Sequence, residues 1–146
     1  MERRVIVRGV VYKDGRLLVV RRKSSQEHWS LPGGSLVNTE GLEYGLRREF
    51  MEEMGVEAEV GRLLFVQQFY HYGWNNERLE LFFLVENVED FVGVSLAGTT
   101  HGEEEIAEIG WVDPQATEGL LPEFLSEVDI EDYMENVRAV LVRSSF

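Results

Sequence analysis

One segment constrains the fold more than any other, an amphipathic helix pattern that follows a Pro-Gly-Gly turn at residues 32–34. This turn interrupts any regular element, because proline lacks a backbone donor and glycine lowers the cost of unusual dihedral angles. Thr39 is the predicted N-cap of the helix, and Gly55 is placed to end it at about Met54. Apolar residues recur every four positions and predict one face on the core: Leu42, Leu46, Phe50 and Met54.

Three carboxylates lie beside this apolar face, since Glu49, Glu52 and Glu53 are three and four residues apart. Like charges at this spacing destabilise a helix by about 0.2–0.5 kcal/mol, and burial increases the cost. A divalent cation removes the repulsion, and an all-oxygen set suits Mg²⁺, or Mn²⁺ as the alternative. Arg48 offsets part of the charge, and we expect it to pair with Glu40. The adjoining glycine turn can bring a backbone carbonyl to the same place, so the segment predicts a cradle for metal and phosphate.

The whole segment from Gly34 to Val56 resembles the sequence box of the Nudix hydrolase family. In that pattern, glycine, glutamate, arginine and hydrophobic residues occur at fixed spacing, which makes a chance match improbable. Phe50 is bulkier than the aliphatic residue usual at its position, which bears on packing more than on chemistry. Every fixed position is met: Gly34, Glu40, Arg48, Glu49, Glu52, Glu53 and Gly55, with Phe50 and Val56 in the hydrophobic positions.

This resemblance implies a Mg²⁺-dependent pyrophosphohydrolase that cleaves a nucleoside diphosphate linked to another moiety. The substrate classes implied are nucleoside triphosphates, dinucleoside polyphosphates and nucleotide sugars. By position, Glu49, Glu52 and Glu53 would be metal ligands together with the Gly33 carbonyl, and Glu49 would also help to activate water. Glu40 and Arg48 would orient the loop and helix. The alternative is a non-catalytic Nudix module that senses a nucleotide or binds a protein.

Four residues outside the box are candidates for substrate binding. Basic residues like Arg21 and Arg22 contact phosphates in family members, with solvated charges at a strand end as the alternative. Strand alternation places Arg21 and Lys23 on one face and Arg22 on the other, so at most two of these three are expected to face the site. Tyr72 and Trp74 alternate onto one face and are candidates for stacking a base, with core packing as the alternative. Tyr72 also lies near the position at which a tyrosine indicates dinucleoside polyphosphate substrates in the family.

The acidic run Glu103-Glu104-Glu105 precedes the last predicted strand. In some Nudix hydrolases a glutamate in such a loop is the catalytic base, so one of these three is a candidate for contact with metal or water. The alternative is a solvated acidic loop.

The remaining pattern predicts an α+β fold, a Nudix-like α/β/α sandwich with a mixed sheet, the box loop–helix–loop and a C-terminal helix from Pro122. Asp14-Gly15 between two β-branched runs predicts a hairpin. The predicted strands are 5–12, 17–20, 29–31, 58–72, 79–88 and 106–112. We expect one domain over residues 1–146.

The net charge of −13 argues against a nucleic-acid polymer or an anionic membrane as partner. The acidic excess is uneven, because residues 77–146 contain 17 acidic and 3 basic side chains. Cysteine is absent, which excludes thiol catalysis and Cys-ligated zinc. No targeting or membrane segment is recognised, so a cytoplasmic protein with a small nucleotide as ligand is expected. The first strand and the terminal helix are candidates for a homodimer contact.

Overall fold

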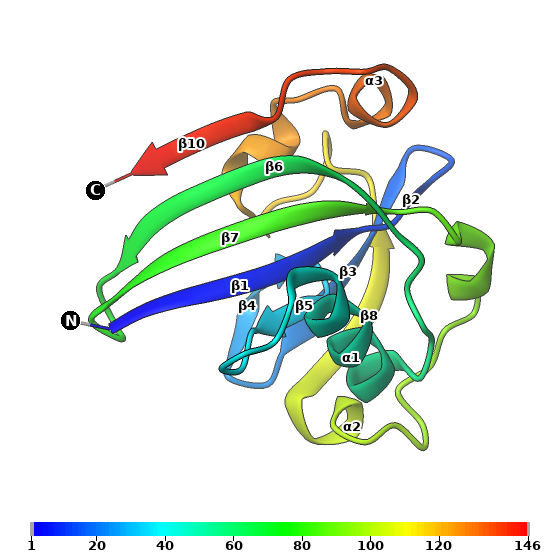
Figure 1. Ribbon diagram of the computed structural model, residues 1–146. Coiled ribbons are helices and arrows are strands. Elements are labelled where there is room, and N and C mark those ends of the chain that lie inside the picture. Colours follow the sequence, from blue (N-terminus) through cyan, green and yellow to red (C-terminus); the bar gives the residue numbers. More distant parts are fainter. Residues whose placement is uncertain (1, 146) are drawn as a thin grey trace.

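Two β-sheets that share an apolar core form the centre of the protein (Figure 1). The computed structural model describes residues 2–145. The first sheet has the order β10-β6-β7-β1-β5, with bounds Leu141–Ser145, Val60–His71, Asn76–Val85, Glu2–Val10 and Gly33–Ser35. The second has the order β2-β3-β4-β9, with β8 also paired to β3; the bounds are Tyr12–Lys13, Arg16–Arg22, Ser25–Ser30, Leu120–Leu121 and, for β8, Ile106–Val112.

Alternation along β7 explains why side chains on both faces of the first sheet enter the core. In β7, Phe82 and Leu84 pack into the cluster shared with the second sheet, whereas Phe83 and Val85 pack under the helix α1 (Leu42–Met54). The first sheet is mixed, because β1 runs parallel to β7 while β6 and β7 are antiparallel. β1 pairs with β7 along its whole length and with β5 over Ile6–Arg8.

The strand predictions agree with the structure to within a few residues for the long elements. Asp14 and Gly15, both with positive φ, form the predicted hairpin turn between β2 and β3. The last predicted strand, 106–112, coincides with β8. Short helical turns connect the remaining strands: η1 (Val88–Phe91), α2 (Gly102–Glu105) and η2 (Glu123–Ser126).

The predicted start of the box helix is wrong by two residues. Gly41 is the N-cap of α1, and no side chain caps it. Thr39 instead lies in the preceding loop with a φ of 67°, and its hydroxyl donates to the Asn38 carbonyl at 2.5 Å. The predicted end is confirmed, because Gly55 is in the left-handed conformation with a φ of 70° and donates its N–H to the Met51 carbonyl.

The predicted continuous helix from Pro122 is also wrong. The segment contains η2, the six-residue helix α3 (Ile130–Glu135) and the strand β10, which pairs in parallel with β6. Phe124 and Leu125 enter the core as predicted, but Val137 is 95% exposed. The edge of β6 offers backbone partners to β10, and a chain with Val140 and Val142 is well suited to a strand.

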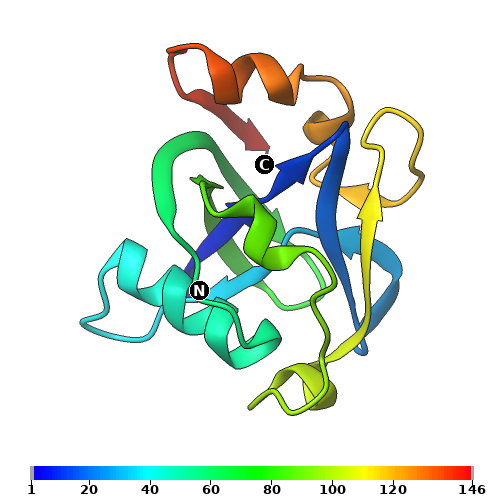
Figure 2. The same cartoon turned by 90° about the vertical axis from the view of Figure 1, so that its right-hand side faces the viewer.

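Helix α1 and the C-terminal segment lie on opposite sides of the sheets (Figure 2). Within residues 2–145, no helix is both long and apolar enough to cross a membrane.

Candidate active site

The glycine turn and α1 lie against each other at the end of β1. Gly33 has a φ of 143°, and a Cβ on this residue would meet the Val7 carbonyl oxygen at 2.0 Å, so only glycine fits. At Gly34 an added Cβ would lie 2.5 Å from the carboxyl carbon of Glu49. The sequence therefore brings the backbone of β5 directly against the acidic face of the helix.

Arg48 binds three carboxylates at the solvent side of α1. Its guanidinium donates to Glu40 through Nε at 2.5 Å and through a second nitrogen at 2.9 Å. The remaining nitrogen donates to Glu49 at 3.1 Å and to Glu52 at 3.0 Å. We refer to these four residues as the Arg48 network. The predicted pairing of Arg48 with Glu40 is confirmed, and it ties the loop before α1 to the helix itself.

Arg22 holds the carboxylate at the buried side of the helix. From the end of β3, its guanidinium donates to Glu53 Oε1 at 3.0 Å and to the Gly33 carbonyl at 2.7 Å. The side chain of Glu53 is 1% exposed, and its other oxygen, Oε2, is buried with no hydrogen-bond partner among the described residues. We refer to Arg22, Gly33 and Glu53 as the Arg22 bridge.

The carboxylate pKa values of the site shift in different directions. Hydrogen bonds from Arg48 lower the pKa of Glu40, since they stabilise its ionised form. Burial raises the pKa of Glu53 to about 7, against the opposing influence of Arg22, and burial likewise raises the pKa of Glu49. At Glu53 the effect of burial therefore outweighs the positive charge of Arg22.

A cleft of about 790 Å³ opens beside the Arg22 bridge. Its walls come from both sheets and from the segment after β9. Its lining residues include Arg8, Arg22, Gln67, Trp74, Arg78 and Arg143.

The donor set fits a divalent cation, although the carboxylates are not gathered on one point. Within residues 2–145, no three His, Asp or Glu side chains are grouped as a metal site. Arginines separate them: Arg48 holds Glu49 and Glu52, and Arg22 holds Glu53. The unpartnered Glu53 oxygen and the Gly33 carbonyl are nevertheless hard oxygen donors at one place. A cation there would satisfy a buried atom that the protein leaves without a partner.

The comparisons with known proteins decide the family. The family model described as NUDIX domain matches residues 2–130. This chain belongs to the NUDIX family. The structure is similar to a MutT NUDIX hydrolase from Burkholderia pseudomallei, with a TM-score of 0.69 and 22% identity over 87% of this chain and 98% of that one. The Nudix resemblance and the predicted α+β sandwich are thereby confirmed.

Curated relatives match this NUDIX chain over part of its length. An RNA pyrophosphohydrolase of Teredinibacter turnerae is 38% identical over 73 residues, 49% of this chain and 40% of the relative. A MutT-like protein of Streptomyces ambofaciens is 48% identical over 60 residues, 40% of this chain and 38% of the relative. The chain thus spans about two fifths of the length of these relatives.

The structure separates the two arginines predicted to bind phosphate. Arg22 reaches the NUDIX box, whereas Arg21 points to the other face of β3. There its guanidinium carbon lies 4.1 Å from the centre of the Trp29 ring, and it pairs with Glu108 at 3.6 Å. The two arginines thus lie on opposite faces of β3, as strand alternation predicts.

The two predicted stacking aromatics also separate. Trp74 lines the cleft, and the guanidinium carbon of Arg78 lies 4.4 Å from the centre of its ring. Tyr72 is 81% exposed and contacts the edge of Tyr70 rather than lining the cleft.

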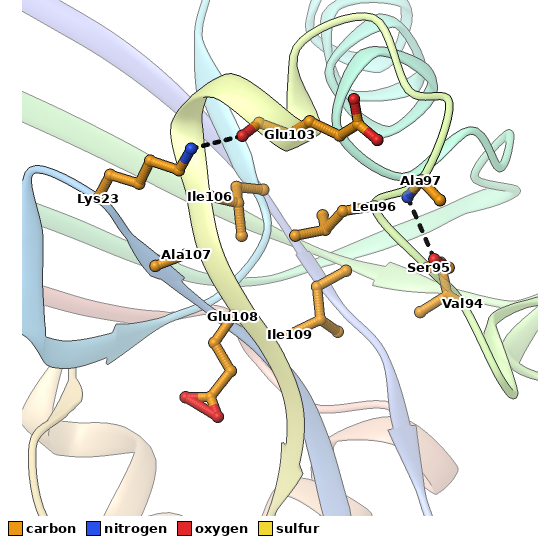
Figure 3. A pocket seen from close by; sticks show the side chains of 10 residues that line it. All are labelled: Lys23, Val94, Ser95, Leu96, Ala97, Glu103, Ile106, Ala107, Glu108 and Ile109. Carbon is orange, nitrogen blue, oxygen red and sulfur yellow. Dashed lines mark hydrogen bonds between the residues drawn. The ribbon is translucent and has the colours of Figure 1, made fainter.

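The acidic run at residues 103–105 lies in the helical turn α2 and is exposed. The Glu103 carboxylate accepts a hydrogen bond from the Gly98 N–H at 3.2 Å, and its carbonyl accepts one from Lys23 Nζ at 2.6 Å. Figure 3 shows Glu103 at a separate hollow of about 530 Å³ between β8 and the loop at residues 94–97. None of the three is hydrogen-bonded or ion-paired to a residue of the Arg48 network or the Arg22 bridge within the described chain.

Sequence reasoning assigned no role to His101, yet this residue contacts the box. Its Nδ1 lies 3.1 Å from Glu52 Oε2, and its backbone N–H donates to the Glu52 carbonyl at 2.8 Å. The neighbouring Gly102 permits this approach, because a Cβ there would meet the Glu53 carbonyl oxygen at 2.1 Å. A lone His-Gly pair in a loop gave no periodic signal that could have identified the contact.

Sequence reasoning also missed a buried ion pair at the floor of the cleft. Arg8 on β1 donates to Glu80 on β7 at 2.9 Å and to the Leu31 carbonyl at 3.1 Å. Gln67 on β6 donates to the same carboxylate at 3.3 Å. The signal in the sequence was a charged residue at an inward position of a strand, Arg8 in one strand and Glu80 in another. Only the parallel register of β1 and β7 makes the two residues neighbours.

Proposed function

We propose that this NUDIX chain is a divalent-metal-dependent pyrophosphohydrolase that cleaves a nucleoside diphosphate linked to another moiety. The observation that supports it most is the buried Glu53 carboxylate, which has an unpartnered oxygen and shares with the Gly33 carbonyl a hydrogen-bond donor, Arg22, that lines the cleft. The names of the curated relatives, among them an RNA pyrophosphohydrolase and a CTP pyrophosphohydrolase, agree with this reaction class.

Glu53, Glu49, Glu52 and the Gly33 carbonyl are the groups that would hold Mg²⁺, or Mn²⁺ as the alternative. When bound, the cation would neutralise charge on phosphate oxygens and lower the pKa of a water molecule. The Glu53 pKa of about 7 means that much of this carboxyl is protonated at neutral pH without metal, so binding would release a proton.

The chain's own residues supply positioning and charge. Arg22 lies between the carboxylates and the cleft, so its guanidinium is placed to bind the oxygens of the scissile pyrophosphate. Arg48 keeps Glu49 and Glu52 on one side of the helix and joins them to the loop through Glu40. The cleft beside Arg22 is large enough for a small-molecule ligand.

The experiment is a substrate panel with Mg²⁺ or Mn²⁺, read out by the identity of the products. The panel contains nucleoside triphosphates, dinucleoside polyphosphates, nucleotide sugars and a 5′-triphosphorylated oligonucleotide. We expect hydrolysis at a phosphoric anhydride bond in at least one class and none in EDTA. Tight nucleotide binding without product from any class would overturn the proposal in favour of a non-catalytic module.

A further inference from the structure

Arg78 is the unusual cation of the cleft. Three arginines of β1 in the same sheet have carboxylate partners: Arg3 with Glu77, Arg4 with Glu2, and Arg8 with Glu80. Within residues 2–145, Arg78 has no carboxylate within ion-pair distance. Its Nε donates to the Asn76 side chain at 3.3 Å, and its guanidinium lies over the ring of Trp74.

The surroundings of Arg78 disfavour its charge. Burial lowers the pKa of the guanidinium, Glu80 opposes that effect, and the nearby charges of Arg8 and Arg4 add to it. A partly desolvated cation among like charges is a site where an anion would bind favourably. The Trp74 ring, 4.4 Å from the guanidinium carbon, restricts the motion of the Arg78 side chain, so less conformational freedom is lost when a ligand binds.

A second arginine faces the same cleft from β10. Arg143 is level with Gln67 of β6, which in turn is level with Glu80 of β7. Arg78 is two residues from Glu80, so it projects from the same face of the sheet. In the described chain, Arg143 has neither a hydrogen bond nor an ion pair through its side chain. The lining carboxylates of Glu27, Glu123 and Glu127 come from other segments of the cleft wall, outside β6, β7 and β10.

The strand registers place Arg78 away from the Arg22 bridge. Gly33 and Phe82 are both level with Arg8, whereas Arg78 is level with Arg4. Four residues of strand correspond to roughly 13 Å. That separation exceeds one pyrophosphate unit and suits a group on the far side of the nucleoside from the scissile bond.

We propose that Arg78, held by Trp74 and assisted by Arg143, binds a second phosphate group that is separated from the scissile pyrophosphate by a nucleoside. The preferred substrates are then nucleotides that carry a further phosphate on the sugar, as a monoester or as the diester of a following nucleotide. This inference rests on the proposed function for the position of the pyrophosphate. It also assigns Trp74 to the support of an arginine instead of to base stacking.

The test is metal-free binding, measured by calorimetry, so that it does not depend on turnover. Each nucleoside 5′-monophosphate is compared with its 3′,5′-bisphosphate and with the 5′-phosphorylated dinucleotide, for adenosine, guanosine, cytidine and uridine. For at least one base we expect the second phosphate to tighten binding about tenfold, as one charge-assisted contact predicts. A stronger gain with the bisphosphate indicates a monoester ligand, and an equal or stronger gain with the dinucleotide indicates a diester.

Variants assign the gain to Arg78. In Arg78→Ala we expect the ratio of the two dissociation constants to fall to about one, and in Arg78→Lys to recover in part, because lysine keeps the charge without the planar fork. Arg16→Ala removes an equal charge from the exposed hairpin and leaves the ratio unchanged. Trp74→Ala reduces the ratio as well, whereas a base-stacking residue would weaken both ligands equally.

The proposal is overturned if no base shows more than a twofold gain from the second phosphate, or if no ligand of the set binds. It is also overturned if Arg78→Ala retains the gain while its melting temperature matches that of the parent protein. Failure of the substrate panel with a retained gain in binding would count against the proposed hydrolysis alone.

Discussion

The Arg48 network and the Arg22 bridge both hold carboxylates of one helix with one arginine, yet they differ in origin and in charge balance. The Arg48 network lies within 13 residues of sequence, is partly exposed, and gives Glu40 a lowered pKa. The Arg22 bridge joins β3, β5 and α1, and it leaves Glu53 buried with a raised pKa and an unpartnered oxygen. The Arg48 network therefore stabilises the helix and the loop before it. The Arg22 bridge leaves a carboxylate oxygen that a cation could still bind.

The largest expected effect comes from Glu53→Gln. The amide keeps the shape but removes the anionic oxygen, so metal binding and turnover should fall by at least about a hundredfold. The metal-free protein should be no less stable at neutral pH, because a buried ionisable group is removed. Turnover with Mg²⁺ and Mn²⁺ binding measure the two properties. Glu43→Gln, an exposed position of the same helix, is the matched control and should change neither.

Next in size is Arg22→Met, which removes the only cation of the Arg22 bridge. Without metal, the Glu53 carboxylate then loses its counterion, and the free energy of unfolding at pH 8 should fall by about 3 kcal/mol. Mn²⁺ should recover more stability in this variant than in the parent, since it replaces the missing charge. Urea unfolding with EDTA and with Mn²⁺ tests both points. An equal gain in stability from Mn²⁺ in the parent and in Arg22→Met would contradict the view that Arg22 compensates the charge of Glu53.

Arg48→Met should lower metal-free stability less than Arg22→Met does. It should reduce turnover about 10–100-fold, as expected for a residue that orients metal ligands. Amide exchange of the loop at residues 35–41 should become faster, because Arg48 also contacts the Ser35 carbonyl and Glu40. Arg48→Lys should restore turnover only in part, because lysine cannot form the paired contacts to Glu40. A loop that exchanges at the parent rate in Arg48→Met would show that the network is not what holds it.

The pH dependence of metal-free stability should distinguish Glu53 from Glu40 by sign. The folded pKa of Glu53, about 7, exceeds its ordinary value of 4.5, so the folded state binds more protons between these values. Stability should therefore fall as pH rises through this window, by up to about 1.4 kcal/mol per pH unit. Glu40 has a lowered pKa, so its contribution is present above about pH 4.5 and is lost as pH falls. Urea titrations from pH 4 to 8 should show the downward slope in the parent and a flatter profile in Glu53→Gln.

The smallest expected effect is that of Thr39→Ala, at the loop end of the Arg48 network. A helix N-cap contributes about 1 kcal/mol, but the Thr39 hydroxyl bonds within the loop, so the free energy of unfolding should change by less than about 0.5 kcal/mol. Urea unfolding is the measurement. A loss near 1 kcal/mol would contradict this and would indicate that Thr39 caps the helix, as the sequence predicted.

Prediction from the sequence succeeded where contacts are local and periodic. Three residues of the predicted stripe, Leu46, Phe50 and Met54, are buried as expected, and Gly55 ends the helix. Leu42, in the first turn of the helix, is exposed, so the prediction that it faces the core is wrong. It failed after Pro122, where the spacing of apolar residues suits a helix. In the structure, Phe124 and Leu125 enter the core and residues 141–145 pair with the edge of β6. A free strand edge competes for the same residues, and nothing near them in sequence reveals that edge.

The sequence by itself determined the family, the acidic face of α1 and the pairing of Arg48 with Glu40, because fixed spacing on one helix and its loop sets which side chains meet. Only the tertiary structure decided that Arg22 and not Arg21 reaches Glu53, that His101 contacts Glu52, and that Arg78 lies over Trp74 in the cleft. These contacts join residues from separate strands and loops. Their geometry depends on strand register and on the depth of burial, and those are properties of the packed sheets.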